Sequence, residues 1–283
     1  MKTSSRERAT GTARASSGGS MKVTLLGSGD AIGMPVPLCD CEYCQESERR
    51  RRPGLLVETD EATLVFEMSP EIKEQMHDVE VFKVDAFFVT HHHFDHFAGI
   101  RELDHIAIEE HVLNTEDFDY NGWHGREISV YGNQTAWNHL QEKQGHIAGN
   151  ENIKFQIMGS GDIVEIGDVA VEAFEVEHGE ETQGYVIQKE DTKVVYLPDV
   201  RNLTGDEDCY EDADIALMEG QLFGAESHGH TEEIEENIEQ VDAERTVLVN
   251  ISEHLNQMHT EELEEAAREK GYEVWSDFES AQI

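Results

Sequence analysis

Apolar residues occur with two different spacing patterns along the chain. Short runs rich in β-branched and aromatic residues, typical of β-strands, alternate with stretches in which apolar residues recur every three or four positions, as in amphipathic helices. Gly-Asp pairs at 161–162 and 167–168 flank an apolar run at 163–166 and predict hairpin turns. We predict strands at 22–26, 55–57, 63–66, 86–89, 128–131, 169–174, 194–197 and 246–249, and helices at 71–76, 134–142, 232–241 and 261–270.

The order of these elements predicts the fold class. Strands occur in two series, each followed by helices, and 283 residues are enough to bury a substantial core. This favours a single α/β domain, residues 21–283, in which two sheets pack together and helices cover the outside. Residues 1–20 are rich in Ser, Gly, Thr and Ala, so we interpret them as a flexible leader, a vector-derived extension or a segment upstream of the true start at Met21.

Charge is the unusual feature of the composition. The chain has 61 acidic and 21 basic residues, which gives a formal net charge of −40. The acidic residues alternate with apolar ones at helical spacing, as around Ile234 and Ile238, so the charge belongs to a folded surface and not to a disordered chain. Self-repulsion on this scale is relieved by salt, since the screening length falls to about 3 Å at about 1 M salt. We hypothesise a halophilic source, with an acidic mesophilic protein as the alternative.

The same features predict where the protein works and what it meets. No run of 18 apolar residues occurs, and no apolar stretch follows the basic residues at the N-terminus. We therefore expect a cytoplasmic protein with neither a membrane span nor a secretory signal. The acidic surface should repel nucleic acid and anionic lipid, so the expected partner is a small molecule. A homodimer is left open.

A dense group of potential metal ligands follows one predicted strand. After the apolar residues 86–89 the sequence reads Thr-His-His-His-Phe-Asp-His, from Thr90 to His96. Imidazole and carboxylate are the ligands expected for zinc, iron or manganese. A loop that turns into a helix can direct two ligands at each of two neighbouring ions. We predict metal ligands at His91, His93, Asp95 and His96.

This pattern resembles that of the metallo-β-lactamase superfamily, and the likeness extends over the whole chain from Met21. The resemblance implies a four-layer αβ/βα sandwich and a metal site completed by a later His, a bridging Asp and a final His. The later His matches His178, and the bridging Asp matches Asp199 at another strand end. Where relatives end a strand in Leu-Thr-His, this sequence has Asn250. Either Asn250 holds the second metal more weakly, through its side-chain oxygen or water, or His254 takes the place.

Three of the four cysteines lie close together, at Cys39, Cys41 and Cys44. In a cytosolic chain this spacing predicts thiolate metal ligation more readily than a disulfide. A tetrahedral structural zinc needs one more donor, for which the candidates are His254 and His259, and we prefer His254. The isolated Cys209 is interpreted as an inert packed thiol.

The N-terminal part narrows the resemblance. Residues 27–35, the cysteine run and residues 51–57 look like the PhnP cyclic phosphodiesterases of phosphonate metabolism. That resemblance implies a structural zinc on the three cysteines and on a His that corresponds best to His254. The glycines at 27–33 do not form a dinucleotide fingerprint, because Pro35 follows in place of a helix, and they predict a tight turn beside the active site.

The resemblance also implies a mechanism. With two divalent metals, zinc or manganese, about 3.5 to 4 Å apart, a bridging hydroxide attacks phosphorus while both ions neutralise the other oxygens. The first ion is assigned to His91, His93 and His178, the second to Asp95 and His96, and Asp199 would bridge them. The predicted catalytic residues are Asp95 and His230. His230 resembles the general acid of the family, and its alternative role is to cap the helix at 232–241 or to lie exposed.

Three function classes compete at this point. The first is a phosphodiesterase acting on a small cyclic phosphodiester, similar to a phosphoribosyl cyclic phosphate. The second is a tRNA 3′-end endonuclease, which should have an extended basic arm, and we expect none outside the leader. The third is a non-catalytic metal-binding protein with a degenerate site at Asn250. Thioester or lactone hydrolysis remains open because one fold hosts many reactions.

Overall fold

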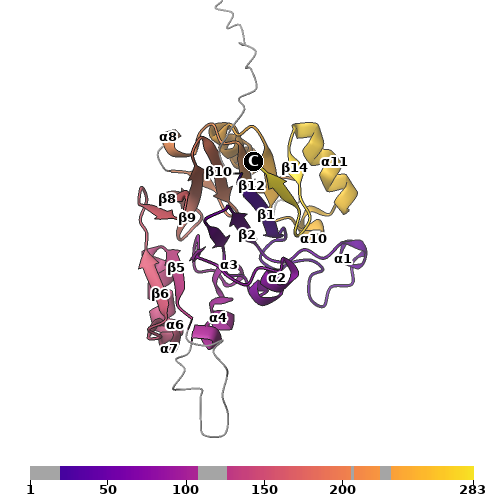
Figure 1. The fold of residues 1–283 in the computed structure, drawn as a ribbon. Coiled ribbons are helices and arrows are strands. Elements are labelled where there is room, and N and C mark those ends of the chain that lie inside the picture. Colours follow the sequence, from indigo (N-terminus) through magenta and orange to yellow (C-terminus); the bar gives the residue numbers. More distant parts are fainter. Residues whose placement is uncertain (1–19, 108–125, 205–206, 224–230) are drawn as a thin grey trace, which may run out of the picture.

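Two β-sheets face each other across the centre of the molecule, and helices lie on their outer sides (Figure 1). The computed structural model describes residues 20–107, 126–204, 207–223 and 231–283. The first sheet has the strand order β15-β1-β2-β3-β4-β5-β6. Its strands are β1 Lys22–Gly27, β2 Gly54–Glu58, β3 Thr63–Phe66, β4 Ala86–Phe88, β5 Ile128–Gly132, β6 Ile153–Ile157 and β15 Ser280–Gln282.

The second sheet has the order β11-β8-β9-β10-β12-β13-β14, and β7 pairs with β8 at its side. Its strands are β7 Ile163–Ile166, β8 Val169–Glu177, β9 Glu181–Lys189, β10 Thr192–Leu197, β11 Asn202–Leu203, β12 Ile215–Glu219, β13 Thr246–Val249 and β14 Glu273–Val274. The helices are α1 Glu42–Glu46, α2 Ile72–Asp78, α3 Phe94–Phe97, α4 Ile100–Ala107, α6 Gln134–Lys143, α7 Gly145–Ala148, α8 Glu207–Tyr210, α9 Thr231–Val241, α10 Glu253–Asn256 and α11 Thr260–Lys270.

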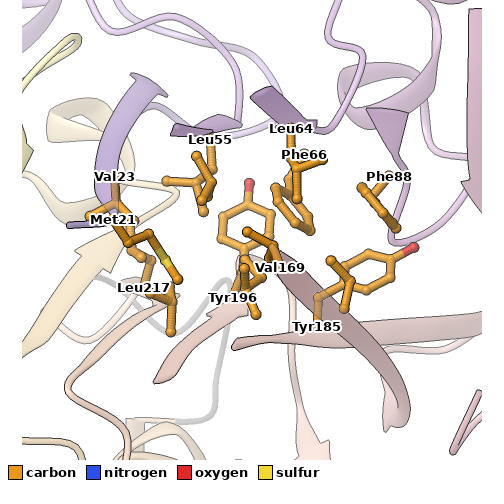
Figure 2. Close-up of a cluster of buried hydrophobic side chains, with 14 of the residues drawn as sticks. Met21, Val23, Leu55, Leu64, Phe66, Phe88, Val169, Tyr185, Tyr196 and Leu217 are labelled. Atoms are coloured by element: carbon orange, nitrogen blue, oxygen red, sulfur yellow. The ribbon is translucent and has the colours of Figure 1, made fainter. Parts of the chain in front are cut away.

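Three clusters of buried apolar residues divide the molecule into four layers. The central cluster lies between the sheets, where Phe66 and Phe88 stack at 5.0 Å and Tyr185 meets both rings edge-on (Figure 2). Successive strand residues point to opposite faces, so Tyr196 joins the central cluster while Leu197 joins a second one beneath α9 and α11. A third cluster lies under α2, α6 and α7. This is the expected four-layer αβ/βα sandwich.

The predicted strands are all present, with ends that differ by up to three residues, and so are the four predicted helices. The Gly-Asp turn at 167–168 joins β7 to β8, and Gly167 has a positive φ of 59°. The prediction missed β9, where Gly184 interrupts the apolar pattern. A Cβ at Gly184 would lie 2.5 Å from Leu197 Cδ2 and 2.6 Å from a ring carbon of Phe174, so the glycine permits close packing of the strand.

Parallel pairing brings several strand ends to one edge of the molecule. Strands β3 to β6 run parallel in the first sheet, and β10, β12 and β13 run parallel in the second. Ligands bind at the carboxyl ends of such parallel strands. The His91 motif follows β4, Asp199 follows β10 and Asn250 follows β13. A bridge between Gly29 and Ile251 joins the two sheets at this edge.

Residues 49–52 are four consecutive arginines, so the expectation that no basic run occurs outside the leader was wrong. Arg50 is buried, and its Nε lies 2.7 Å from Glu253 Oε1. Arg51 pairs with Asp277 and Asp78, and Arg52 pairs with Glu71. Acidic side chains within the protein neutralise the charges of these three arginines. Because some of these partners are distant in the sequence, the arginine run links separate segments of the chain.

Candidate metal centre

The His91 motif occupies the turn between β4 and α3. His93 is the N-cap of α3, which directs Asp95 and His96 from the first turn of the helix into the protein. His91 and His96 are completely buried and Asp95 nearly so, whereas His93 is half-buried. The hydroxyl of Thr90 lies 2.9 Å from His91 Nδ1, which leaves His91 Nε2 facing the neighbouring histidines. The motif therefore presents one ligand atom from each of these four side chains to a common centre.

The potential ligands form two groups, and Asp199 belongs to both of them. Its Oδ2 atom lies 3.5 Å from His91 Nε2, 3.3 Å from His178 Nε2 and 3.1 Å from His96 Nε2. One group of potential ligand atoms consists of His91, His93, His178 and Asp199, and a second consists of Asp95, His96 and Asp199. One carboxylate shared by two such groups is the arrangement expected for a bridging ligand.

Polar atoms in this cluster lie close together without all forming good hydrogen bonds to one another. His96 Nε2 is buried and lies 2.8 Å from Asp95 Oδ2, yet it has no hydrogen bond of good geometry among the described residues. His91 Nε2 and His93 Nδ1 approach to 2.7 Å. Buried nitrogen and oxygen atoms without good partners are costly unless a further group binds them. Their donor types, imidazole and carboxylate, fit a divalent transition metal.

Burial and neighbouring charges shift the pKa values of the cluster residues in opposite directions. Burial lowers the pKa of His91 well below its ordinary value, and the positive charge of His96 adds to the effect. Burial acts in the same direction on His96, but Asp199, Glu67 and Asp95 surround this ring and hold its pKa well above the ordinary value. Burial would raise the pKa of Asp199, whereas His96, His91 and His178 lower it. The surrounding imidazoles thus favour the ionised form of Asp199, which is the form that binds a metal.

Asn250 lies at this centre, as the sequence predicts. The residue is buried and adopts the left-handed conformation with φ 59°. Its amide Nδ2 donates to Pro198 O at 2.8 Å and to Asp199 Oδ1. Its Oδ1 atom is buried and accepts no hydrogen bond from the described part of the chain. Asn250 therefore contacts the shared carboxylate directly.

His254 lies with the cysteines and not with the paired ligand groups. Its Nδ1 atom is 3.6 Å from Cys39 Sγ, 3.4 Å from Cys41 Sγ and 3.7 Å from Cys44 Sγ. These four side chains form a separate group with the donor set of a tetrahedral structural zinc site. Cys39, Cys41 and Cys44 are not joined by disulfides. Of the two candidates for the fourth donor, the structure brings His254 to the thiols, while the His259 ring contacts Tyr43 at 5.1 Å.

A family model described as the β-lactamase superfamily domain matches residues 63–251. The chain belongs to the metallo-β-lactamase superfamily. The fold implies divalent metal binding, and the ligand groups described above are the candidates to hold the ions.

Known proteins resemble the chain over different lengths. It is 27% identical over 258 residues to an octanoyltransferase of Porphyromonas gingivalis, an alignment that covers 86% of this chain and 48% of that protein. It is 34% identical over 144 residues to a ribonuclease Z of Methanopyrus kandleri, covering 50% and 46%. The chain spans about half the length of these curated relatives. The structure of a diphosphatase from the PhnP family matches with a TM-score of 0.74 and 23% identity, over 93% of this chain and 97% of that one.

Sequence reasoning missed two carboxylates beside the metal-ligand groups, the fully buried Glu67 and the partly buried Glu219. Glu67 follows β3, and its Oε1 atom lies 3.3 Å from His96 Nδ1. Glu219 ends β12, and its Oε2 atom lies 3.4 Å from Asn250 Nδ2. Burial raises the pKa of both carboxyl groups, and for Glu219 the charge of Asp199 adds to the rise. A single acidic residue at a strand end is a weak signal in a chain with 61 of them.

The predicted general acid, His230, lies outside the described residues, as does the leader up to residue 19. Within the described ranges, none of the helices combines the length and the apolar character required to cross a lipid bilayer.

Proposed function

We propose that this chain hydrolyses a small phosphodiester, a cyclic phosphate of a ribose derivative, at a dinuclear metal centre. The observation that supports the proposal most is the position of Asp199 Oδ2, within 3.5 Å of imidazole nitrogens from both ligand groups. A bridging carboxylate suits two adjacent ions, and two-metal sites are typical of phosphoester hydrolysis. The similarity of the fold to a diphosphatase of the PhnP family supports hydrolysis at phosphorus.

Each ligand group has its own part in the proposal. His91, His93 and His178 would hold one ion, Asp95 and His96 the other, and Asp199 would bind both. When bound, two such metals lower the pKa of water and offset the negative charge that develops on the phosphoryl oxygens. Thr90 orients the His91 ring through its hydrogen bond with Nδ1, and the Glu67 carboxylate lies 3.3 Å from His96 Nδ1. His230 is proposed to protonate the leaving alkoxide.

The acidic surface supports a small substrate. With a formal net charge of −40, the chain repels a long polyanion much more strongly than it repels a single phosphodiester. The similarity to ribonuclease Z favours tRNA 3′-end processing as the second candidate. Binding of tRNA is the discriminating measurement, because a nuclease should bind its RNA at moderate salt, whereas a small-molecule enzyme should not.

Hydrolysis of bis-p-nitrophenyl phosphate by protein loaded with Mn²⁺ or Zn²⁺ tests the proposal. We expect turnover in the native chain and none in Asp199→Ala, with Asp60→Ala as the control because Asp60 is an exposed carboxylate in the turn between β2 and β3. A folded, fully metal-loaded protein that hydrolyses neither this compound nor a cyclic phosphate would contradict the proposal. That result would favour the non-catalytic alternative.

A further inference from the structure

Asn133 joins three segments of the chain beside the metal centre. It is buried and is the N-cap of α6, where its Oδ1 atom accepts a hydrogen bond from Ala136 N at 2.8 Å. Its Nδ2 atom donates to Thr90 O at 3.2 Å and to Glu181 O at 2.7 Å. One side chain thus begins the helix and ties it to two other segments.

The two tied segments carry ligands assigned to the first ion. Thr90 immediately precedes His91, and its hydroxyl lies 2.9 Å from His91 Nδ1. Glu181 begins β9, directly after the turn that carries His178. Asn133 therefore connects the backbone just before His91 with the backbone just after the His178 turn.

Two more exposed contacts join the same segments. Thr135, in the first turn of α6, donates to the Glu181 carboxylate from its backbone N at 3.0 Å and from its hydroxyl. A negative charge is favourable at a helix N-terminus. His92 Nε2, in the ligand motif, lies 3.0 Å from Glu180 Oε2 in the turn after β8. The buried Asn133 amide and these surface contacts hold the motif, the helix and the turn together.

We propose that the first turn of α6 sets the spacing between the ligands of the first ion, with Asn133 as the principal positioning residue. His91 follows β4 of the first sheet, whereas His178 lies between β8 and β9 of the second, so their relative position depends on contacts between the sheets. Ligands that are already in place lose less freedom when an ion binds, which raises its affinity. The proposal rests on the ligand assignment of the proposed function but not on its substrate.

Titration of the metal-free protein with Co²⁺ tests the proposal without requiring turnover. Co²⁺ bound by thiolates and Co²⁺ bound by imidazole and carboxylate absorb light differently, so the cysteine site and the paired ligand groups are followed separately. Asn133→Ser keeps a preferred N-cap residue but has no amide to reach both carbonyls. We expect it to raise the dissociation constant of the tighter imidazole-bound ion about tenfold, the lower end of the effect of outer partners of metal ligands. The constant of the cysteine site should not change.

Ala136→Gly is the matched control for a loss of helix stability. Ala136 is buried in the same turn of α6, and glycine weakens a helix while keeping the backbone N–H that Asn133 accepts. This variant should lower the melting temperature and leave the ratio of the two dissociation constants unchanged.

A second variant covers the case in which Asn133→Ser does not fold. Folding is expected, because Thr90 O also accepts from Gln183 N at 3.1 Å and so keeps a partner. Thr135→Val removes only the exposed hydroxyl bond to Glu181 and should raise the same dissociation constant by a smaller factor. If only this variant folds, an unchanged constant in it would overturn the proposal.

The outcomes separate this proposal from the proposed function. An unchanged ratio in Asn133→Ser would refute the positioning role, and so would an equal change in Ala136→Gly, since helix stability alone would then explain the effect. A native chain that binds no Co²⁺ through imidazole would overturn the ligand assignment and both proposals. A native chain that shows the expected Co²⁺ ratios but does not hydrolyse bis-p-nitrophenyl phosphate keeps the positioning role and loses the function.

Discussion

Asn250 donates a hydrogen bond from its side-chain amide to Asp199, the carboxylate shared by the two ligand groups. A neutral amide oxygen is a poorer ligand than imidazole for a transition metal. We therefore predict that the ion held by Asp95, His96 and Asp199 binds more weakly than its neighbour and that activity depends on added Mn²⁺ or Zn²⁺. Asn250→His should tighten this ion, as measured by metal content after dialysis and by titration of activity with metal. Full occupancy of both sites in the native protein would contradict the prediction.

Asp199 and His93 should be indispensable for catalysis and dispensable for folding. We expect Asp199→Ala and His93→Ala to lower kcat/KM by more than about 100-fold, since each removes a direct ligand and not only an outer contact. Without metal, His93→Ala should melt close to the native chain because this half-buried side chain belongs to no core cluster. Asp199→Ala should still fold but melt lower, because it removes a carboxylate that pairs with the buried His96. Normal turnover in either variant, with metal content verified, would exclude the assigned ligand set.

Cys41→Ser should release about one zinc per chain and lower stability, because structural zinc is coupled to folding. A backbone hydrogen bond from Cys44 and the His254 ring lower the pKa of Cys41 to about 6, which favours the thiolate that binds metal. Cys209→Ser is the control, since Cys209 lies outside the group. Zinc content and the melting temperature provide the readout. Equal zinc in the two variants would disprove the thiolate site.

Asp168 should stabilise the fold at neutral pH but not in acid. Its carboxylate lies 2.7 Å from Lys189 Nζ and also accepts from Thr59. Burial opposes ionisation of Asp168, but these two hydrogen bonds outweigh it and lower the pKa of the group. A depressed pKa in the folded state gives stability that is present above the unfolded pKa and is lost as pH falls through the folded one. Asp168→Asn should therefore lower the free energy of unfolding at pH 7, and the difference should shrink below about pH 4, the unfolded value. A loss that is independent of pH would contradict this.

Salt should stabilise the protein if its source is halophilic. The net charge of −40 is a large self-repulsion, and raising KCl from about 0.1 to 2 M shortens the screening length several-fold. We expect the melting temperature and activity to rise together over this range. Retained structure and full activity after dialysis into low salt would favour the acidic mesophilic alternative.

The sequence was sufficient to predict the strands whose residue pattern is local. Strand residues 63–66 and 246–249 were predicted at their observed bounds, because β-branched and aromatic residues fill both. Strand β12 was missed, since its apolar run at 215–218 contains only one β-branched residue, Ile215, and shows no alternation. Its neighbours β10 and β13 determine its conformation, and they are distant in sequence.

The sequence also failed to predict those parts of the site that depend on partners distant in the chain. The motif from His91 to His96 is a dense local signal, and the resemblance to the superfamily pointed to His178 and Asp199. Glu67 and Glu219 acquire their positions only when β3 and β12 lie beside the ligand-bearing strands. The roles of the arginines at 50–52 depend on partners as distant as Glu253 and Asp277. Pairings across more than 200 residues leave no pattern in a single sequence.

The short distance along the chain from Asn250 to His254 ties the two metal sites together. Within five residues the backbone leaves the paired ligand groups, forms the Ile251 bridge to Gly29, and reaches the thiols through α10, which the Arg50–Glu253 pair anchors. If an ion among the cysteines orders this segment, it reduces the entropy lost when Asn250 is fixed at the other site. Thermodynamic linkage makes such an effect reciprocal, so occupancy of either site raises the affinity of the other by the same factor.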